Sequence, residues 1–264
     1  MESHGLSKPF VALVVALYVF LLSPLAITLA ISFSNDPFLG FPPEQWGTRW
    51  YGVLLGNPRF LAAFQNSLAI AATTMAVGLA AGIPAAYAIA RGSFPGRDAL
   101  LALFTAPLLL PSIVLGLALL LVFSQLNLAS TFHGLVLAHL VVTLPYVVRI
   151  VTVGLSTIRP EYEEAAMTLG ASPWRVFRRV TLPLMVPGIV GSAALTFLVS
   201  FDEVVVSLFL VGPRLTTLPV EILRYVETRT DPQVAALSVI LIAITVALVV
   251  LIERSVGVMR ALGR

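Results

Sequence analysis

Apolar residues fill six long stretches of the chain, and polar residues gather between them. Each stretch is nearly free of charge and reaches the length of about 20 residues that a helix needs to cross the hydrocarbon core of a bilayer. Backbone groups find no water in lipid, so such segments must be helical. The pattern predicts an all-α integral membrane protein, a single transmembrane domain over residues 1–264 with six transmembrane helices. We expect the spans at about 10–33, 62–90, 99–123, 133–155, 184–211 and 234–252.

Composition agrees with lipid as the natural solvent. Hydrophobic residues make up 58% of the chain and charged residues 11%, whereas soluble domains carry about 25% charged residues. The absence of cysteine excludes disulfides, thiolate metal sites and cysteine nucleophiles. The three histidines, His4, His133 and His139, lack the spacing of a metal site, so we expect no metal and no catalytic residue. The formal net charge of +3 does not suggest a nucleic-acid partner.

The basic residues indicate the orientation of the spans. An even number of spans puts both chain ends on one side of the membrane. If both ends are cytoplasmic, eleven Lys and Arg residues lie inside and five lie outside, in agreement with the positive-inside rule. The outer residues are Arg49, Arg59, Arg214, Arg224 and Arg229. The inner residues are Lys8, Arg91, Arg97, Arg149, Arg159, Arg175, Arg178, Arg179, Arg254, Arg260 and Arg264.

Glycine and proline punctuate the spans. Gly78 and Gly82 form a GxxxG pair, which lets another backbone approach closely, either within the chain or at a dimer seam. Prolines inside spans bend a helix and free a carbonyl. This suits a moving bundle, and it is equally the ordinary tolerance of membrane helices for proline. The prolines concerned are Pro24, Pro84, Pro107, Pro111 and Pro145.

The longest cytoplasmic stretch, residues 156–183, predicts two short helices outside the bilayer. Pro160 suits a first helical position, and three glutamates in the first turn complement the helix dipole. Gly170 suits a helix stop, and Ser172 with Pro173 starts a second helix. One face of the first helix carries Tyr162, Ala165, Ala166 and Leu169. The small side chains of Ala165 and Ala166 permit close approach to a partner. The alternative is a helix resting on lipid headgroups, which the acidic first turn opposes.

The spacing within this stretch resembles the EAA loop of ABC importer inner-membrane permeases, the MetI-like family. The matching positions are Glu164, Ala165, Ala166, Gly170 and residues 180–183, with Val180 where the family usually has Ile. In that family the loop forms coupling helices that sit in a cleft of the ATP-binding subunit. The resemblance therefore assigns ATPase coupling to Glu164, Ala165, Ala166 and Gly170.

Shorter matches extend the resemblance over about residues 10–255 and favour spermidine/putrescine-type permeases. They lie at residues 32–34, 50–51, 66–67, 144–146, 200–202 and 218–220. The resemblance implies a bacterial inner-membrane protein with an ABC ATPase dimer, a second permease, identical or homologous, and a periplasmic or extracellular solute-binding protein as partners. The chain has no GxxxxGK[ST] loop, and its sole lysine, Lys8, follows no glycine loop. ATP must therefore be hydrolysed by another chain, and we expect neither enzyme activity nor a cofactor.

Two adjacent acids, Asp202 and Glu203, fall inside the fifth apolar stretch. A charged group inside a span costs about 2.5–3.5 kcal/mol on insertion scales. We therefore expect Asp202 or Glu203 to face the path of a cationic solute such as a polyamine, the alternative being a contact between helices. Trp46, in the first outer loop, either belongs to an aromatic belt at the membrane surface or lies near the solute entrance.

Other functions are open on the sequence alone. Permeases for ferric iron, thiamine or opine-like solutes share several of the shorter matches. A self-contained secondary transporter usually places several ionisable groups at membrane depth, whereas this chain offers chiefly Asp202 and Glu203. A membrane enzyme would need a catalytic set such as Ser/His/Asp or HExxH, which the sequence does not supply.

Overall fold

The structure is a computed structural model that describes the backbone of residues 8–262. Helices are its regular elements, and the described residues add an isolated bridge between Ser34 and Trp46. The chain ends, residues 1–7 and 263–264, lie outside the described range, and so does Arg264 of the predicted inner set. The helices are α1 (Lys8–Ser32), α2 (Arg49–Leu55), α3 (Pro58–Arg91), α4 (Arg97–Thr105), η1 (Ala106–Leu109), α5 (Ser112–Gln125), α6 (Phe132–Ser156), α7 (Pro160–Thr168), α8 (Pro173–Val176), η2 (Phe177–Thr181), α9 (Leu182–Phe201), α10 (Val205–Leu210), α11 (Leu218–Thr228) and α12 (Gln233–Leu262).

Four helical runs among the described residues are long and apolar enough to cross a membrane. They are α1, α3, α6 and the run from α8 through α9, Pro173–Phe201. A fifth is added when Arg97–Leu109 and Ser112–Gln125 are taken together as one bent span. The apolar part of α12, Gln233–Ala247, is shorter. The helical membrane fold is thus confirmed, while the count of six spans stays a prediction.

Two of the predicted spans are not continuous helices. Within 99–123, the runs Arg97–Leu109 and Ser112–Gln125 meet at 104°. Pro111 restricts the residue before it, and Leu110 is extended, with φ −88° and ψ 138°. Within 184–211, α9 ends at Phe201 and α10 begins at Val205. The prediction of an unbroken helix through Asp202 is therefore wrong.

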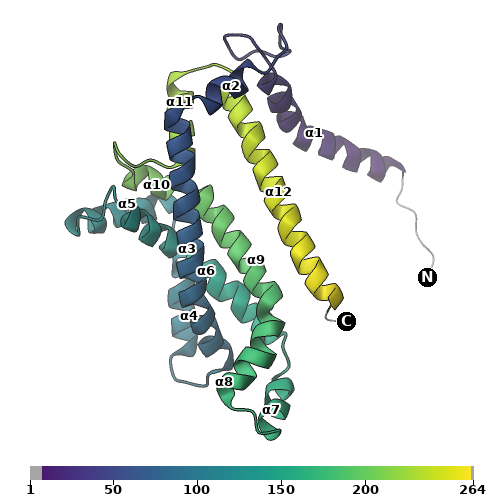
Figure 1. The fold of residues 1–264 in the computed structure, drawn as a ribbon, viewed down its shortest axis with the longest axis vertical. Coiled ribbons are helices and arrows are strands. Elements are labelled where there is room, and N and C mark those ends of the chain that lie inside the picture. The colour runs from purple at the N-terminus through teal and green to yellow at the C-terminus, as the bar shows by residue number, and fades with distance from the viewer. Residues whose placement is uncertain (1–7, 263–264) are drawn as a thin grey trace. The chain divides into compact units, whose positions relative to one another are not determined.

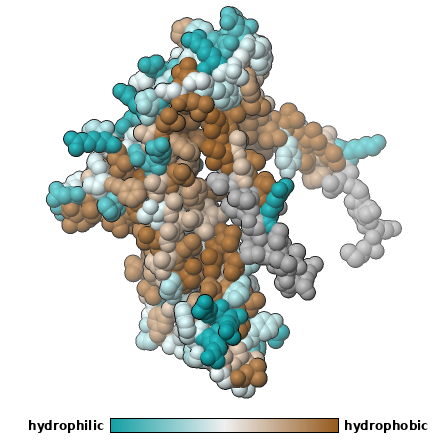
Figure 2. Space-filling model, in the orientation of Figure 1, coloured by the Kyte–Doolittle hydropathy of each residue, from teal (hydrophilic) through white to brown (hydrophobic). Residues whose placement is uncertain are grey.

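One compact unit covers residues 62–221 together with α12 from residue 247 onward. Its central helix is α6, whose residues Leu135, Val147 and Leu155 are fully buried. Helix α9 packs along α6, and α5 packs against α10 (Figure 1). Figure 2 shows apolar residues along these helices and hydrophilic ones over α7 and α8. A band of exposed apolar side chains is what lipid requires and water opposes.

The GxxxG pair packs inside this unit. A Cβ atom added to Gly82 would lie 2.6 Å from Cγ1 of Val147 on α6. A Cβ atom added to Gly78 would lie 3.5 Å from Cδ2 of Leu140, about two turns before Val147 on the same side of α6. The two glycines therefore let α3 approach α6, which is the first of the two roles predicted for them.

The other compact unit covers the chain to Leu61 and residues 222–246. Its loop after α1 folds around Asp36, whose carboxylate accepts backbone N–H groups of Glu44 at 2.9 Å and Gln45 at 3.1 Å. The indole N–H of Trp50 donates to the carbonyl of Asp36 at 3.1 Å. These hydrogen bonds to Asp36 thus order the loop.

Tyr225 anchors the part of this unit that comes from the end of α11. Its ring lies 5.2 Å from that of Phe60, and its hydroxyl donates to Oδ2 of Asp231 at 2.7 Å. Burial of the phenol, reinforced by the neighbouring Asp231 carboxylate, raises the pKa of Tyr225 to about 12.

Candidate functional site

The segment between α6 and α9 forms the two short helices that the sequence predicts. Helix α7 starts at Pro160, and Gly170 follows it with φ +85°, a conformation that side chains with a Cβ atom rarely adopt. Pro173 starts α8, with Ser172 at the N-cap position, although its hydroxyl makes no capping hydrogen bond. The turn at Gly170 therefore separates two short helices, as the sequence indicates.

The predicted face of α7 points away from the rest of the protein. Leu169 is 89% exposed and Tyr162 is 52% exposed. Ala165 is exposed as well, and Ala166 is half-buried. On α8, Trp174 is 69% exposed. Large apolar side chains are therefore exposed on both short helices.

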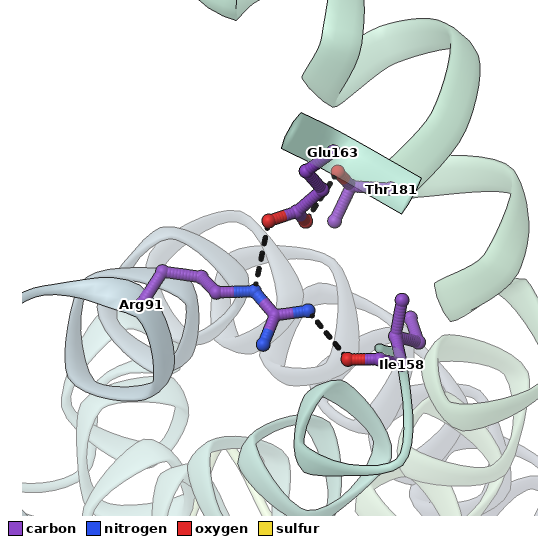
Figure 3. A network of polar contacts seen from close by, with 4 residues as sticks. All are labelled: Arg91, Ile158, Glu163 and Thr181. Carbon is purple, nitrogen blue, oxygen red and sulfur yellow. Dashed lines mark hydrogen bonds and ion pairs between the residues drawn. The ribbon is translucent and has the colours of Figure 1, made fainter. Parts of the chain in front are cut away.

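Glu163 and Glu164 are consecutive residues of α7 with opposite surroundings. Glu164 is exposed, whereas the side chain of Glu163 is 11% exposed. One carboxylate oxygen of Glu163, Oε2, lies 3.1 Å from Nε of Arg91. The other, Oε1, accepts the hydroxyl of Thr181 at 2.7 Å (Figure 3). Both oxygens of one buried acid are therefore in use.

Arg91 extends this network to a further segment. It is the last residue of α3, and its Nη2 donates to the carbonyl of Ile158, between α6 and α7, at 2.9 Å. Thr181 is fully buried and ends η2, a π-helical turn directly before α9. The guanidinium and the carboxylate thus join α7 to the ends of three membrane-length helices (Figure 3).

Sequence reasoning missed this network. It counted Glu163 among the acids of a first helical turn and Arg91 among the inner basic residues, without pairing them. The available signal was the position of Arg91 at the end of a span, where an arginine can reach the first residues outside the membrane. Which of the glutamates of α7 turns inward is decided by packing against α3 and η2, which no local pattern encodes.

The two acids of the fifth span lie at a break in the helix. Asp202 is exposed and follows the last residue of α9. Glu203 is half-buried, and its Oε1 accepts the backbone N–H of Val206 at 2.9 Å, which satisfies a free donor at the start of α10. Asp202 therefore presents an exposed carboxylate, whereas one carboxylate oxygen of Glu203 is engaged by the backbone.

His139, on α6, contacts both helices that flank this break. Its Nδ1 lies 2.8 Å from Oγ of Ser200 on α9, and its Nε2 lies 2.9 Å from Oγ of Ser207 on α10. An imidazole offers one donor and one acceptor, so a single buried side chain satisfies both hydroxyls. The geometry fixes the turn that carries Asp202. Sequence reasoning weighed His139 only as a metal ligand and missed this contact.

Trp46 belongs to the other compact unit and is 62% exposed. Its backbone forms the isolated bridge with Ser34, which holds the loop after α1. The predicted place of Trp46 near the solute entrance stays a prediction.

The sequence profile of a family described as "Binding-protein-dependent transport system inner membrane component" matches residues 78–260. The chain belongs to this family. The match includes Arg91, α7, α8 and the break at Asp202, whereas Trp46 precedes it.

Individual members of the family match nearly the whole of this inner-membrane component. The spermidine/putrescine transport system permease protein PotC of Escherichia coli K12 is 32% identical over 235 residues, which cover 89% of each chain. The putrescine transport system permease protein PotI of the same strain is 34% identical over 232 residues, 85% of this chain and 82% of PotI.

Solved structures show the same fold for this permease. A chain of a bacterial alginate ABC transporter, crystallised with an alginate pentasaccharide-bound periplasmic protein, matches with a TM-score of 0.73 at 16% identity. The match covers 92% of this chain and 91% of that one. The chain therefore has the fold of an ABC transporter subunit, and its family match makes it an inner-membrane component of a binding-protein-dependent transport system.

Proposed function

We propose that this permease forms half of a solute path and docks a separate ABC ATPase through α7. The observation that carries this is the exposure of Leu169, 89%, on a helix whose opposite side is held by Glu163. An exposed apolar side chain at the end of a rigidly held helix is suited to insertion into a cleft of a partner protein. Ala165 and Gly170 leave room for that partner, and Glu164 lies at its edge.

The proposed complex contains an ATPase dimer, a second permease and an external solute-binding protein. The exposed apolar surface of α6 and α9, with Val153 58% exposed and Leu184 48% exposed, supports contact with lipid or with the second permease. Both chain ends are then cytoplasmic, on the same side as α7. The loop that carries Trp46 lies on the outer side and is available to the binding protein.

Docking is tested by co-purification of the ATPase with permease variants in detergent. Leu169→Asp introduces a charge into the proposed contact and should remove the ATPase, while Ala165→Arg should do so by its size. The matched control is Phe94→Asp, at an exposed apolar residue of the turn between α3 and α4. Retention of the ATPase by Leu169→Asp and Ala165→Arg at the level of the control would contradict docking through α7.

We propose further that the solute is a polyamine. The names of the relatives PotC and PotI support a polyamine, and so does an exposed acid at a break in an apolar span. Asp202 is the group for a cationic amine, because Glu203 is engaged by the backbone of Val206. Ferric iron, thiamine and opine-like solutes are the competing substrates. Uptake of radiolabelled putrescine and spermidine into cells without other polyamine importers tests the class, and uptake of neither would contradict it.

A further inference from the structure

The acid of α7 that the loop pattern singles out is not the one that the structure connects to the membrane helices. Glu164 stands in the pattern and is exposed. Among the described side chains it takes part in no ion pair and no hydrogen bond of its carboxylate. Glu163 contacts both Arg91 and Thr181. Motion of α7 therefore reaches other helices through Glu163.

The surroundings of Glu163 make these contacts stiff. The side chains of Glu163 and Arg91 are 11% and 17% exposed, and Thr181 is fully buried. Screening by water is weak at such a site, and a charge-assisted hydrogen bond is shorter and stronger than a neutral one. Removal of one partner would leave a buried charge unpaired, which is strongly unfavourable. The contacts thus resist separation when α7 is displaced.

The covalent route from α7 to α9 is less direct. It passes through the turn at Gly170, which sits in the left-handed region, and then through α8 and η2 before it reaches α9. Most residues of this route are exposed. The route through Glu163 instead ends on Thr181, one residue before α9, and on Arg91, the end of α3. A displacement of α7 is therefore transmitted by side chains more faithfully than by the connecting turn.

We propose that Arg91, Glu163 and Thr181 form a junction that transmits movement of α7 to α3 and α9, so that coupling depends on Glu163 rather than on Glu164. The proposal rests on the proposed function, in which α7 receives the movement of an ATPase. Glu163 is a positioning residue here, since it acts through α3 and α9 and does not contact a solute.

The test uses the assembled transporter with pairs of spin labels in this chain, which has no native cysteine. Thr168→Cys on α7 and Leu184→Cys on α9 carry the labels, and their separation is measured without nucleotide and with ATP bound. In the parent protein the separation should be the same in both states, because α7 and α9 move together. In Glu163→Gln and in Thr181→Val it should change on ATP binding.

Matched controls separate the junction from general damage to the fold. Glu164→Gln makes the same chemical change one residue away, and Thr181→Ser keeps the hydroxyl; both should keep the α7–α9 label separation the same with and without ATP. Thr181→Val keeps the shape of the side chain, so the test holds if Glu163→Gln fails to fold. Uptake of radiolabelled putrescine per ATP hydrolysed should fall at least tenfold in the two junction variants and stay unchanged in Thr181→Ser, which keeps the hydroxyl that Glu163 accepts.

The outcomes distinguish this proposal from docking itself. An ATP-dependent change of the α7–α9 separation in the parent, or its absence in both Glu163→Gln and Thr181→Val, would overturn the junction while docking stands. Retention of the ATPase by Leu169→Asp would overturn docking. The label measurement requires no solute, so it decides the matter whatever the transported compound is.

Discussion

Nε2 of His139 lies 2.9 Å from Oγ of Ser207, across the break that separates α9 from α10. The same ring holds Ser200 on the other side of the break. All three side chains are buried. The turn that presents Asp202 is therefore fixed by polar contacts inside an apolar bundle, where few competing hydrogen-bond partners exist.

The first prediction follows from this contact. His139→Leu leaves the hydroxyls of Ser200 and Ser207 without their partner, and each buried unpaired polar group costs about 1–3 kcal/mol. We expect a lower melting temperature of the purified permease. The triple variant that adds Ser200→Ala and Ser207→Ala should recover most of the loss, because no polar group is then left unpaired. A single variant as stable as the parent would show that the contact is unimportant.

The second prediction concerns the close approach of α3 and α6. Gly82→Ala places a Cβ atom against the side chain of Val147 and should destabilise the fold by about 1–3 kcal/mol, the usual cost of overpacking. Gly191, in α9, has open space around it, so Gly191→Ala is the matched control and should be neutral. Thermal unfolding of both variants in the same detergent compares them, and equal melting temperatures would refute tight packing at Gly82.

The third prediction is the orientation of the chain. Cysteines placed at Phe94 and Leu169 should resist a membrane-impermeant thiol reagent in intact cells and react after permeabilisation. A cysteine at Phe38, which is 70% exposed in the loop after α1, should react in intact cells. Labelling of Leu169→Cys from outside would reverse the orientation and remove the docking proposal with it.

The fourth prediction concerns the solute. Asp202→Asn keeps the shape of the side chain and removes its charge. A hydrogen bond to a charged group contributes about 1.5–3 kcal/mol, so we expect putrescine uptake to fall about tenfold to a hundredfold while ATPase binding persists. Glu203→Gln is the control, since its amide oxygen can still accept the N–H of Val206. Equal uptake by Asp202→Asn and the parent would exclude a cation site at this residue.

The fifth prediction is that the stability of the unit that contains Tyr225 falls at alkaline pH. Its pKa is raised from 10.0 to about 12, so the protonated phenol is the form that the fold favours. The contribution of Tyr225 to stability is fully present below pH 10 and is lost as the pH rises through 12. Absorbance titration should show one tyrosine ionising late, and Tyr225→Phe should abolish that step. An unchanged titration in Tyr225→Phe would contradict the raised pKa.

Hydropathy identifies the membrane helices because lipid leaves an apolar segment with few alternatives to a helix. The turn at Gly170 is equally readable, since a glycine followed by Ser172 and Pro173 carries the chemistry of a helix stop and a restart. In both cases the signal lies within a few residues of the feature that it predicts.

Features set by distant partners escape the same reasoning. Arg91 and Glu163 are separated by two membrane-length segments, and only the packed bundle brings them together. The break at Asp202 escaped because average hydropathy is insensitive to backbone direction. The polar residues Ser200, Ser207 and His139 in apolar stretches were its trace in the sequence, and their meaning depended on knowing that α6 lies beside α9.

The π-helical turn of η2 has a consequence for the whole of α9. A π-turn holds one residue more than an α-turn, and each residue of an α-helix advances the chain by about 100° and 1.5 Å. The turn therefore sets the directions in which the side chains of α9 point. With η2 in π geometry, Thr181 contacts Glu163 and Ser200 contacts His139. Tightening of η2 to α geometry would drive α9 through a screw rotation of about 100°, and both contacts would be lost together.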